Sequence, residues 1–264
     1  MSQSDDNVMT FWEHLEALRG VLLKILATAL VGFIVAFCFR DALFRLILAP
    51  SRPDFCFYRA VQYVASALGI DAGGLSDFNV DLFSTTLTAQ FMIHMKMALY
   101  VSIVAILPYI LFLLFQFVNP ALHEEERHHT NAAVIWSYLL FMLGAVLDYL
   151  VIFPLAFRFL GTYQVSPDIP NVITLESYTD TLITLTLLMG ILFELPILSW
   201  LMAKLGIIND GFMKKYRRHA LVIILAIAAI ITPTTDIFTL TIVTLPIYLL
   251  YELSIGIVRR TVRR

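Results

Sequence analysis

Long apolar stretches constrain this sequence of 264 residues more than any other feature. Hydrophobic residues make up 59% of the chain and charged residues only 14%. A helix that crosses a bilayer needs about 20 consecutive apolar residues, and segments of roughly that kind lie at about 21–39, 94–118, 132–157, 181–203, 219–232 and 237–257. Backbone polar groups inside a membrane must be hydrogen-bonded within the chain, which favours helices. The sequence therefore predicts an all-α polytopic membrane protein with six transmembrane helices in one membrane domain, residues 1–264.

The distribution of cations predicts the orientation of these helices. Lysine and arginine gather in segment 204–218 and in the tail 259–264, whereas the hairpin 232–236 between the last two spans has none. By the positive-inside rule, the N- and C-termini are then cytoplasmic. A stripe of apolar residues predicts an amphipathic helix at about 8–20 that lies at the inner interface, and the stretch of about 40–93 becomes a long outer loop.

Prolines predict bent spans. Pro108, Pro154, Pro196 and Pro246 lie within the predicted helices, and a proline frees a backbone carbonyl one turn earlier and bends the axis. Bent helices favour a curved, concave bundle. The last two spans are also short, because their uncharged parts extend only about 18 and 22 Å at 1.5 Å per residue, against a core of about 30 Å. We therefore expect the bilayer to thin near them.

Glu194 is a carboxylate near the middle of the fourth predicted span, in the segment GILFELPILSW. A charge is expensive there, so an intramembrane ionisable residue indicates function by default. The alternative is a protonated side chain hydrogen-bonded to a neighbouring helix, or to the Leu192 carbonyl that Pro196 leaves without its helix partner. Three further charged residues of the predicted spans are expected to reach water at a span end, and these are Lys96, Asp148 and Glu252.

The richest polar run is ALHEEERHH, residues 121–129, on the predicted cytoplasmic side. Its histidines do not have the spacing that places two zinc ligands on one helix face, so we expect no metal there. A solvated loop and a site for a cationic partner remain open, the latter because carboxylates pair with guanidinium groups in bidentate geometry.

The function classes that the sequence disfavours follow from missing motifs and charge. The chain has no nucleophile elbow, P-loop or nucleotide fingerprint, so we expect neither an enzyme nor a cofactor. A net charge of −2 makes nucleic acid an improbable partner. Cys38 and Cys56 show neither metal-ligand spacing nor a disulfide framework.

A series of motifs resembles a known family. The chain contains FWEHLEALR, FVNPALHEEER, VIFPLAFRFL, FELPI, TPTTDIF and LPIYLLYE in that order. Together with the predicted topology, they resemble TatC, the C subunit of the twin-arginine protein translocase, over about residues 10–255. The resemblance implies a receptor for signal peptides with paired arginines, which exports folded proteins using the proton-motive force.

The resemblance also implies the site residues. Loop residues Glu126 and Arg127, with Pro120 and Leu122 before them, match the family's signal-peptide contacts. The N-terminal motif contributes His14, Glu16 and Arg19, but Ala17 stands where the family has an acid, and Glu16 is one position early. That displacement is about 100° around a helix, so Glu16 is expected to matter less than Glu126. Glu194, beside Pro196, matches a buried glutamate thought to meet polar groups of partner helices.

The implied partners are twin-arginine signal peptides of folded cargo proteins, small single-span translocase subunits of the TatA/TatB type, membrane lipid and further copies of the chain. The implied location is the bacterial cytoplasmic (inner) membrane. Two other classes remain open from the residues alone. A proton-coupled secondary transporter would also use prolines and an intramembrane acid, although the sequence shows no inverted repeat. An intramembrane protease would need the metal site that the histidine spacing disfavours.

Overall fold

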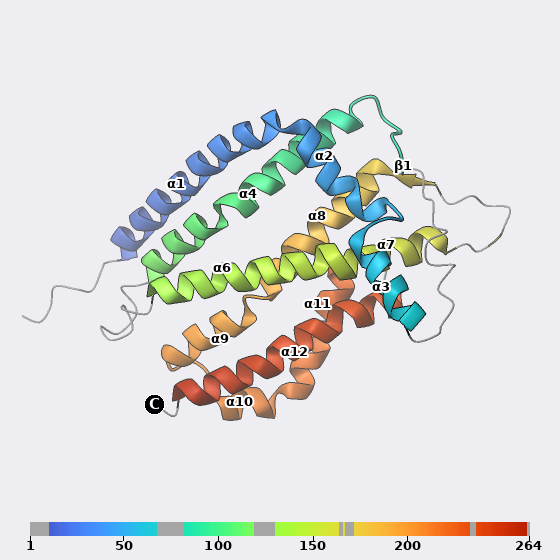
Figure 1. Ribbon diagram of the computed structural model, residues 1–264. Coiled ribbons are helices and arrows are strands. Elements are labelled where there is room, and N and C mark those ends of the chain that lie inside the picture. Colours follow the sequence, from blue (N-terminus) through green and yellow to red (C-terminus); the bar gives the residue numbers. More distant parts are fainter. Residues whose placement is uncertain are drawn as a thin grey trace, which may run out of the picture. The chain divides into compact units, whose positions relative to one another are not determined.

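A computed structural model describes residues 11–67, 82–118, 130–163, 166, 172–232 and 236–262, and its described part is built almost entirely of helices (Figure 1). The α-helices are α1 Phe11–Cys38, α2 Arg40–Leu48, α3 Cys56–Ala67, α4 Ala89–Val118, α6 Thr130–Leu147, α7 Phe153–Thr162, α8 Leu175–Leu192, α9 Leu195–Lys204, α10 Asp210–Lys215, α11 Arg217–Ile231 and α12 Ile237–Val262. The shorter elements are the 3₁₀ turn η1 Ala49–Ser51, the π-helical turn η4 Asp148–Ile152, and strands β1 Leu82–Phe83 and β2 Ile173–Thr174, which pair in parallel. The predicted all-α class is confirmed.

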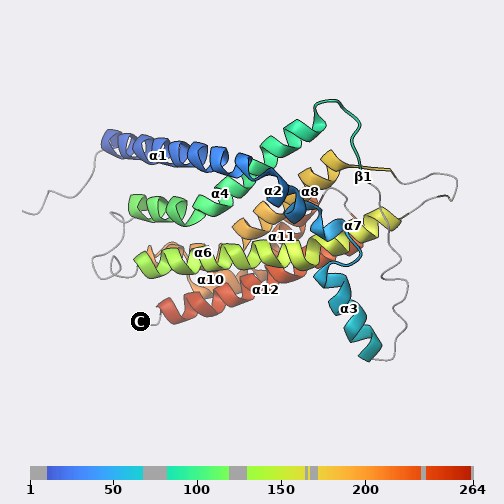
Figure 2. The same ribbon diagram turned by 45° about the horizontal axis from the view of Figure 1, so that its top comes forward.

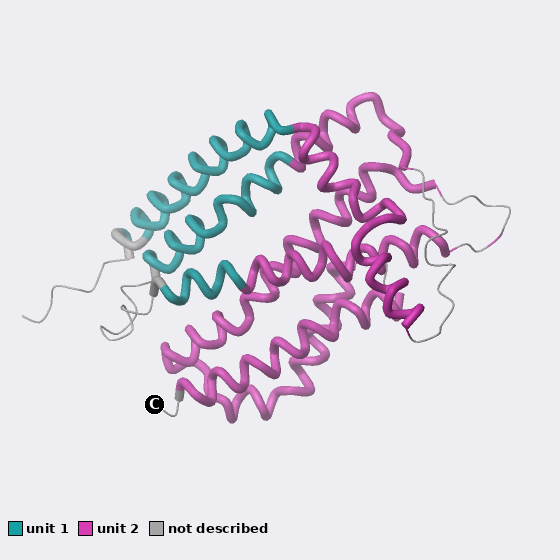
Figure 3. Tube along the Cα trace, in the orientation of Figure 1, with its two compact units in different colours: residues 1–39, 98–139 teal, residues 40–97, 140–264 magenta. Residues whose placement is uncertain are grey.

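The chain forms two compact units (Figure 3). Unit 1 contains residues 1–39 and 98–139, and unit 2 contains residues 40–97 and 140–264. Within unit 1, the Ser102 hydroxyl on α4 donates 2.9 Å to the Ala29 carbonyl on α1. Gly32 faces the same serine so closely that a Cβ there would collide with its Oγ. Small residues at such a crossing let two helix backbones approach and hydrogen-bond in a membrane.

Five helical stretches of the described chain are long and apolar enough to cross a membrane. They are Leu15–Cys38, Ala89–Phe117, Ala132–Thr162, Leu175–Lys204 and Ile237–Thr261. The sixth predicted span corresponds to α11, whose 15 residues extend about 22 Å. Among the described helices that match predicted spans, α11 is thus too short for a core of about 30 Å.

The expectation that the last span is also short is wrong. α12 has 26 residues and continues through Glu252, which had been taken as the end of its apolar part. The Glu252 carboxylate accepts a hydrogen bond of 2.6 Å from Arg217 of α11 and one of 3.2 Å from the Tyr248 hydroxyl. Because these partners compensate the negative charge of Glu252, α12 can include this residue within its length. Of the last two spans, only α11 is then short enough to predict a thinner bilayer.

The N-terminal segment and the outer loop have more regular structure than the sequence predicted. α1 runs without interruption from Phe11 to Cys38, so the described part of the amphipathic segment and the first span form one helix. The stretch of about 40–93 contains α2, η1, α3 and β1, with residues 68–81 outside the described part. Cys38 and Cys56 are both free and exposed.

Three tyrosine hydroxyls attach the outer segment α2–α3 to the spans of unit 2. Tyr149 donates 2.6 Å to the Leu46 carbonyl, and Tyr178 donates 2.7 Å to the Ile47 carbonyl. These carbonyls belong to the last turn of α2, where no intrahelical donor remains. Tyr58 of α3 donates 3.1 Å to the carbonyl of Pro154. Burial raises the pKa of Tyr58 to about 12, against the opposing charge of Arg158, so its hydroxyl remains a donor at neutral pH.

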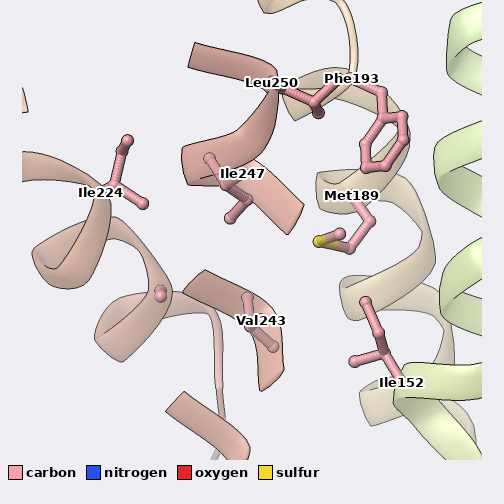
Figure 4. Packing of buried hydrophobic residues seen from close by; sticks show 8 residues of the cluster. Ile152, Met189, Phe193, Ile224, Val243, Ile247 and Leu250 are labelled. Atoms are coloured by element: carbon pink, nitrogen blue, oxygen red, sulfur yellow. The ribbon is translucent and has the colours of Figure 1, made fainter. Parts of the chain in front are cut away.

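The core of unit 2 joins four elements. Ile152 of η4 and Met189 of α8 point toward Val243 and Ile247 of α12, with Ile224 of α11 on the other side (Figure 4). α10 lies beside α12 (Figures 1 and 2), and α9 and α11 also pack against it. α12 is therefore the element around which the C-terminal helices are assembled, and this packing holds α8 and α9 from one side.

We predict that Tyr178→Phe lowers the thermal stability of the purified protein. The substitution keeps the buried ring but leaves the Ile47 carbonyl without its donor, which costs about 1–3 kcal/mol for a buried group. The matched control is Tyr63→Phe, because Tyr63 lies on α3 with 76% of its surface exposed. Thermal unfolding in detergent compares the two variants, and an equal melting temperature for Tyr178→Phe and wild type would contradict the role of the hydroxyl.

Candidate functional site

Glu194 lies in a break between two helices of the fourth span. α8 ends at Leu192 and α9 begins at Leu195, with Pro196 in its first turn. Proline has no N–H to continue the helix ladder, and the Glu194 N–H instead donates 3.0 Å to the Ile191 carbonyl, three residues back. The predicted bend is confirmed as an interruption of the helix. Pro196 is buried and Glu194 is half-buried, so the carboxyl is held within the span.

The C-terminal half of α6 packs closely along the face of α8 that leads to Glu194. A Cβ on Gly144 would lie 2.7 Å from the Met189 carbonyl oxygen and 2.7 Å from the Phe193 ring, and a Cβ on Gly190 would lie 2.5 Å from the Phe141 ring. All three distances are too short for a Cβ, so a side chain at either glycine would force its neighbour to shift, and at Gly144 that neighbour includes backbone. We call these two contacts, formed by Phe141, Gly144, Met189, Gly190 and Phe193, the glycine seam.

Asp148 lies one turn beyond the seam on the third span. Its side chain is 0% exposed, so the expectation that it reaches water at a span end is wrong. Asp148 begins the π-helical turn η4, in which the Phe153 N–H reaches back to the Asp148 carbonyl. Pro154, which has no N–H, follows immediately and removes the next regular helix bond. The Asp148 carboxyl meets the Thr186 hydroxyl of α8 at 2.8 Å.

Lys96 has acidic partners on a different helix. Its ammonium group lies 2.9 Å from Asp180 and 3.4 Å from Glu176, both on α8. The Lys96 side chain is 41% exposed, and its access to water stays a prediction. A half-exposed pair of this kind contributes little to stability. The two contacts nevertheless show that Lys96 faces α8. No spacing in the sequence indicated this pairing.

The structure describes two of the residues implied in signal-peptide binding. Glu16 and Arg19 are exposed on the first turns of α1, whereas Ala17 is half-buried. The side chain of Glu16 is therefore accessible at the helix surface, whereas position 17, where the family has its acid, is less accessible. The side chain of His14 lies outside the described residues, as do Pro120, Leu122, Glu126 and Arg127.

The partners of the intramembrane polar residues were not predicted from the sequence. Thr186 pairs with Asp148, Asp180 with Lys96, and Arg217 with Glu252. One signal for Thr186 was available, because buried residues of α8 recur three and four positions apart, as expected for one helix face. They are Thr179, Leu182, Thr186 and Met189.

These features define a multi-pass helical membrane protein whose spans contain buried polar groups and proline breaks. Its sequence matches the TatC family, described as Sec-independent protein translocase protein, over residues 13–246. The chain belongs to this family. It is therefore a membrane subunit of the twin-arginine protein transport system, and the transporter and protease alternatives are set aside.

Relatives and solved structures agree with this assignment. The chain is 33% identical to the TatC protein of Koribacter versatilis over 259 residues, covering 97% of this chain and 88% of the relative. It is 31% identical to the TatCy protein of Bacillus subtilis over 264 residues, covering 100% and 94%. The crystal structure titled as the twin-arginine translocase receptor TatC is similar with a TM-score of 0.73 and 28% identity, covering 95% of this chain and 100% of that one.

We predict that Gly144→Ala destabilises the protein by about 1–3 kcal/mol, the usual cost of overpacking a core. The new methyl group would collide with the Met189 carbonyl and the Phe193 ring, which forces α6 and α8 apart. Gly256→Ala is the matched control, because nothing lies within 4 Å of a Cβ at this position of α12. Denaturation of both variants in detergent measures the difference, and equal stabilities would show that the seam tolerates an added side chain.

Proposed function

We propose that this TatC-family subunit is the receptor that binds signal peptides with paired arginines at the cytoplasmic face of the membrane. The proposal is supported by family membership over residues 13–246 and by three adjacent carboxylates in the loop sequence HEEER. Carboxylates and guanidinium groups form charge-assisted, bidentate hydrogen bonds. The acidic loop therefore has the chemistry that an arginine pair requires.

Each candidate residue of this site has a proposed role. The Glu126 carboxylate pairs with an arginine of the signal peptide, and Arg127 contributes to the charge pattern beside it. Pro120 and Leu122 shape the loop that carries them. His14, Glu16 and Arg19 of the N-terminal helix form a second, weaker contact, because the acid is displaced by one position from the family's usual place. Binding and transport are the role of these residues, and no bond-making chemistry is assigned to them.

The second part of the proposal is that Glu194 contacts the transmembrane helix of a small partner subunit. The observation that carries it is the place of Glu194 in a proline-induced break, half-buried within the fourth span. A neutral carboxyl can donate one hydrogen bond and accept others. Intramembrane polar pairs contribute about 0.6–2 kcal/mol, which suits a contact that forms and dissolves with each transport event.

The proposed setting is the bacterial cytoplasmic membrane, with both termini on the cytoplasmic side. Basic residues between the fourth and fifth spans support this orientation. There the chain assembles with lipid, with small single-span subunits of the TatA/TatB type and with further copies of itself. The proton-motive force drives export of the folded cargo.

We predict that Glu126→Ala weakens binding of a twin-arginine signal peptide about tenfold or more, because a hydrogen bond to a charged group is worth about 1.5–3 kcal/mol. Glu126→Gln should be nearly as weak, since the amide keeps the shape and loses the charge. Photocrosslinking to a radiolabelled signal peptide measures binding, with a lysine-pair peptide as the reference for lost arginine recognition.

Glu16→Ala serves as the comparison for this prediction, with Ala17→Glu as its counterpart. Glu16→Ala should reduce crosslinking less than Glu126→Ala does, and Ala17→Glu should strengthen it. If Glu16→Ala abolishes binding while Ala17→Glu changes nothing, the argument from helix register is wrong. If Glu126→Ala binds as wild type does, the acidic loop is not the site.

We predict that Glu194→Ala abolishes crosslinks between the positions flanking Glu194 and the helix of a small subunit. Glu194→Gln should retain part of them, because its amide still donates and accepts hydrogen bonds. Ser199→Ala is the control for a small polar change on α9, where Ser199 is half-buried. Equal loss in both Glu194 variants would indicate an ionised or proton-carrying role, and unchanged crosslinks would return Glu194 to a purely structural role.

A further inference from the structure

A chain of three polar groups connects the third span to the fourth. Asp148 Oδ2 lies 2.8 Å from the Thr186 hydroxyl oxygen, and this oxygen lies 2.7 Å from the Leu182 carbonyl oxygen. All three groups are buried within spans, and Thr186 is 3% exposed. Both distances are those of full hydrogen bonds. If both oxygen–oxygen contacts are hydrogen bonds, each of them needs its own hydrogen.

The hydroxyl of Thr186 has only one hydrogen to donate. The Leu182 carbonyl can only accept, so the threonine proton serves that bond, and the second hydrogen must come from Asp148. An ionised carboxylate would leave one of the two short contacts without a hydrogen. A proton on Asp148 Oδ2 supplies both hydrogens, because Asp148 then donates to Thr186 and Thr186 donates to Leu182.

Two further observations support a neutral carboxyl. Asp148 Oδ1 is buried and has no hydrogen-bond partner among the described residues, and no ion pair of Asp148 occurs within the described part of the chain. A buried charge without compensation costs several kcal/mol. In the protonated acid, Oδ1 is an uncharged carbonyl oxygen, and leaving it without a partner costs about 1–3 kcal/mol.

The contact continues the glycine seam in the direction of the outer segment. Phe141 faces Gly190, Gly144 faces Met189 and Phe193, and Asp148 faces Thr186. Close packing at the two glycines fixes the distance between the third and fourth spans. The hydrogen bond adds a directional contact, which restricts rotation of α8 about its axis. Glu194 follows Phe193 directly, about two turns after Thr186. The direction in which its carboxyl points therefore depends on the rotation of α8.

We propose that Asp148 is a proton-bearing positioning residue, whose hydrogen bond through Thr186 to Leu182 fixes the rotation of α8 and thereby the direction in which Glu194 faces. The functional consequence rests on the proposed contact of Glu194 with a partner helix. The protonation and the rotation are properties of this chain alone, and they are tested without any partner.

The first experiment measures the proton. Infrared difference spectra between wild type and Asp148→Asn, recorded on the full chain in lipid, should show the loss of a C=O stretching band of a protonated carboxyl. Thr186→Val removes the acceptor and should shift this band to higher frequency, whereas Thr186→Ser should leave it in place. Loss of carboxylate bands in Asp148→Asn, with no protonated-carboxyl band, would overturn the proposal.

The second experiment measures the rotation of α8. Ile191→Cys, in a background of Cys38→Ser and Cys56→Ser, places a nitroxide on an exposed position of α8, since Ile191 is 54% exposed. Its collision rate with oxygen in the bilayer reports how far the site faces lipid. We expect Asp148→Leu and Thr186→Val to change this rate, and Asp148→Asn to restore the wild-type value because its amide N–H replaces the acid proton.

Thr179→Val is the matched control. Thr179 lies on the same face of α8, is 0% exposed, and its hydroxyl donates 2.7 Å to the Leu175 carbonyl. Its removal deletes a hydroxyl of the same kind without touching Asp148, so the nitroxide signal should stay at the wild-type value. An equal change in Thr179→Val and Thr186→Val, or no change in any variant, would overturn the positioning role.

The two proposals fail in different ways. If the wild-type chain forms no crosslinks with a small subunit near Glu194, the partner contact is wrong, while the infrared and nitroxide results still decide the role of Asp148. If crosslinks form in wild type and disappear in Asp148→Leu but persist in Asp148→Asn, the hydrogen bond positions the partner site. If the crosslinks persist in Asp148→Leu although the nitroxide signal changes, the contact of Glu194 with the partner helix does not depend on the rotation of α8.

Discussion

The absence of water from the bilayer core is the constraint on which this structure depends. Hydrocarbon offers no hydrogen-bond partner, so each polar group inside a span must find one within the protein. Three charged or ionisable residues of the described spans find theirs on another helix. Lys96 meets two acids of α8, Glu252 meets Arg217, and Asp148 meets Thr186. Because each pairing joins two different helical elements, these polar contacts add specificity to the packing of neighbouring helices.

Prolines create further polar groups that need partners. Pro154 follows a π-helical turn whose first residue is Asp148, and Pro196 follows the break that contains Glu194. In both cases a carboxyl lies where the regular helix ladder is interrupted. The two carboxyls differ in their surroundings, since Asp148 is fully buried and Glu194 is half-buried. This difference is consistent with the two roles proposed above, internal positioning for Asp148 and a partner-helix contact for Glu194.

The proposed contact of Glu194 with a partner helix needs both rigid and reversible parts. The core around α12 and the glycine seam provide rigidity, because close packing tolerates little displacement. A single polar contact in the membrane is weak enough to release. We infer that the stable helix packing of unit 2 holds one weak recognition group in a defined direction, so that a partner helix docks in one register without becoming a permanent component.

The sequence by itself determined the class, the family resemblance and most of the spans, because apolar length, cation placement and proline positions act locally along the chain. It also identified Glu194 as unusual from its depth in an apolar segment. It could not give the burial of Asp148 or the true length of α12, since both depend on Thr186, Arg217 and Tyr248. Only the tertiary structure decided these points, because the cost of a polar group in a membrane is set by the neighbour that folding places beside it.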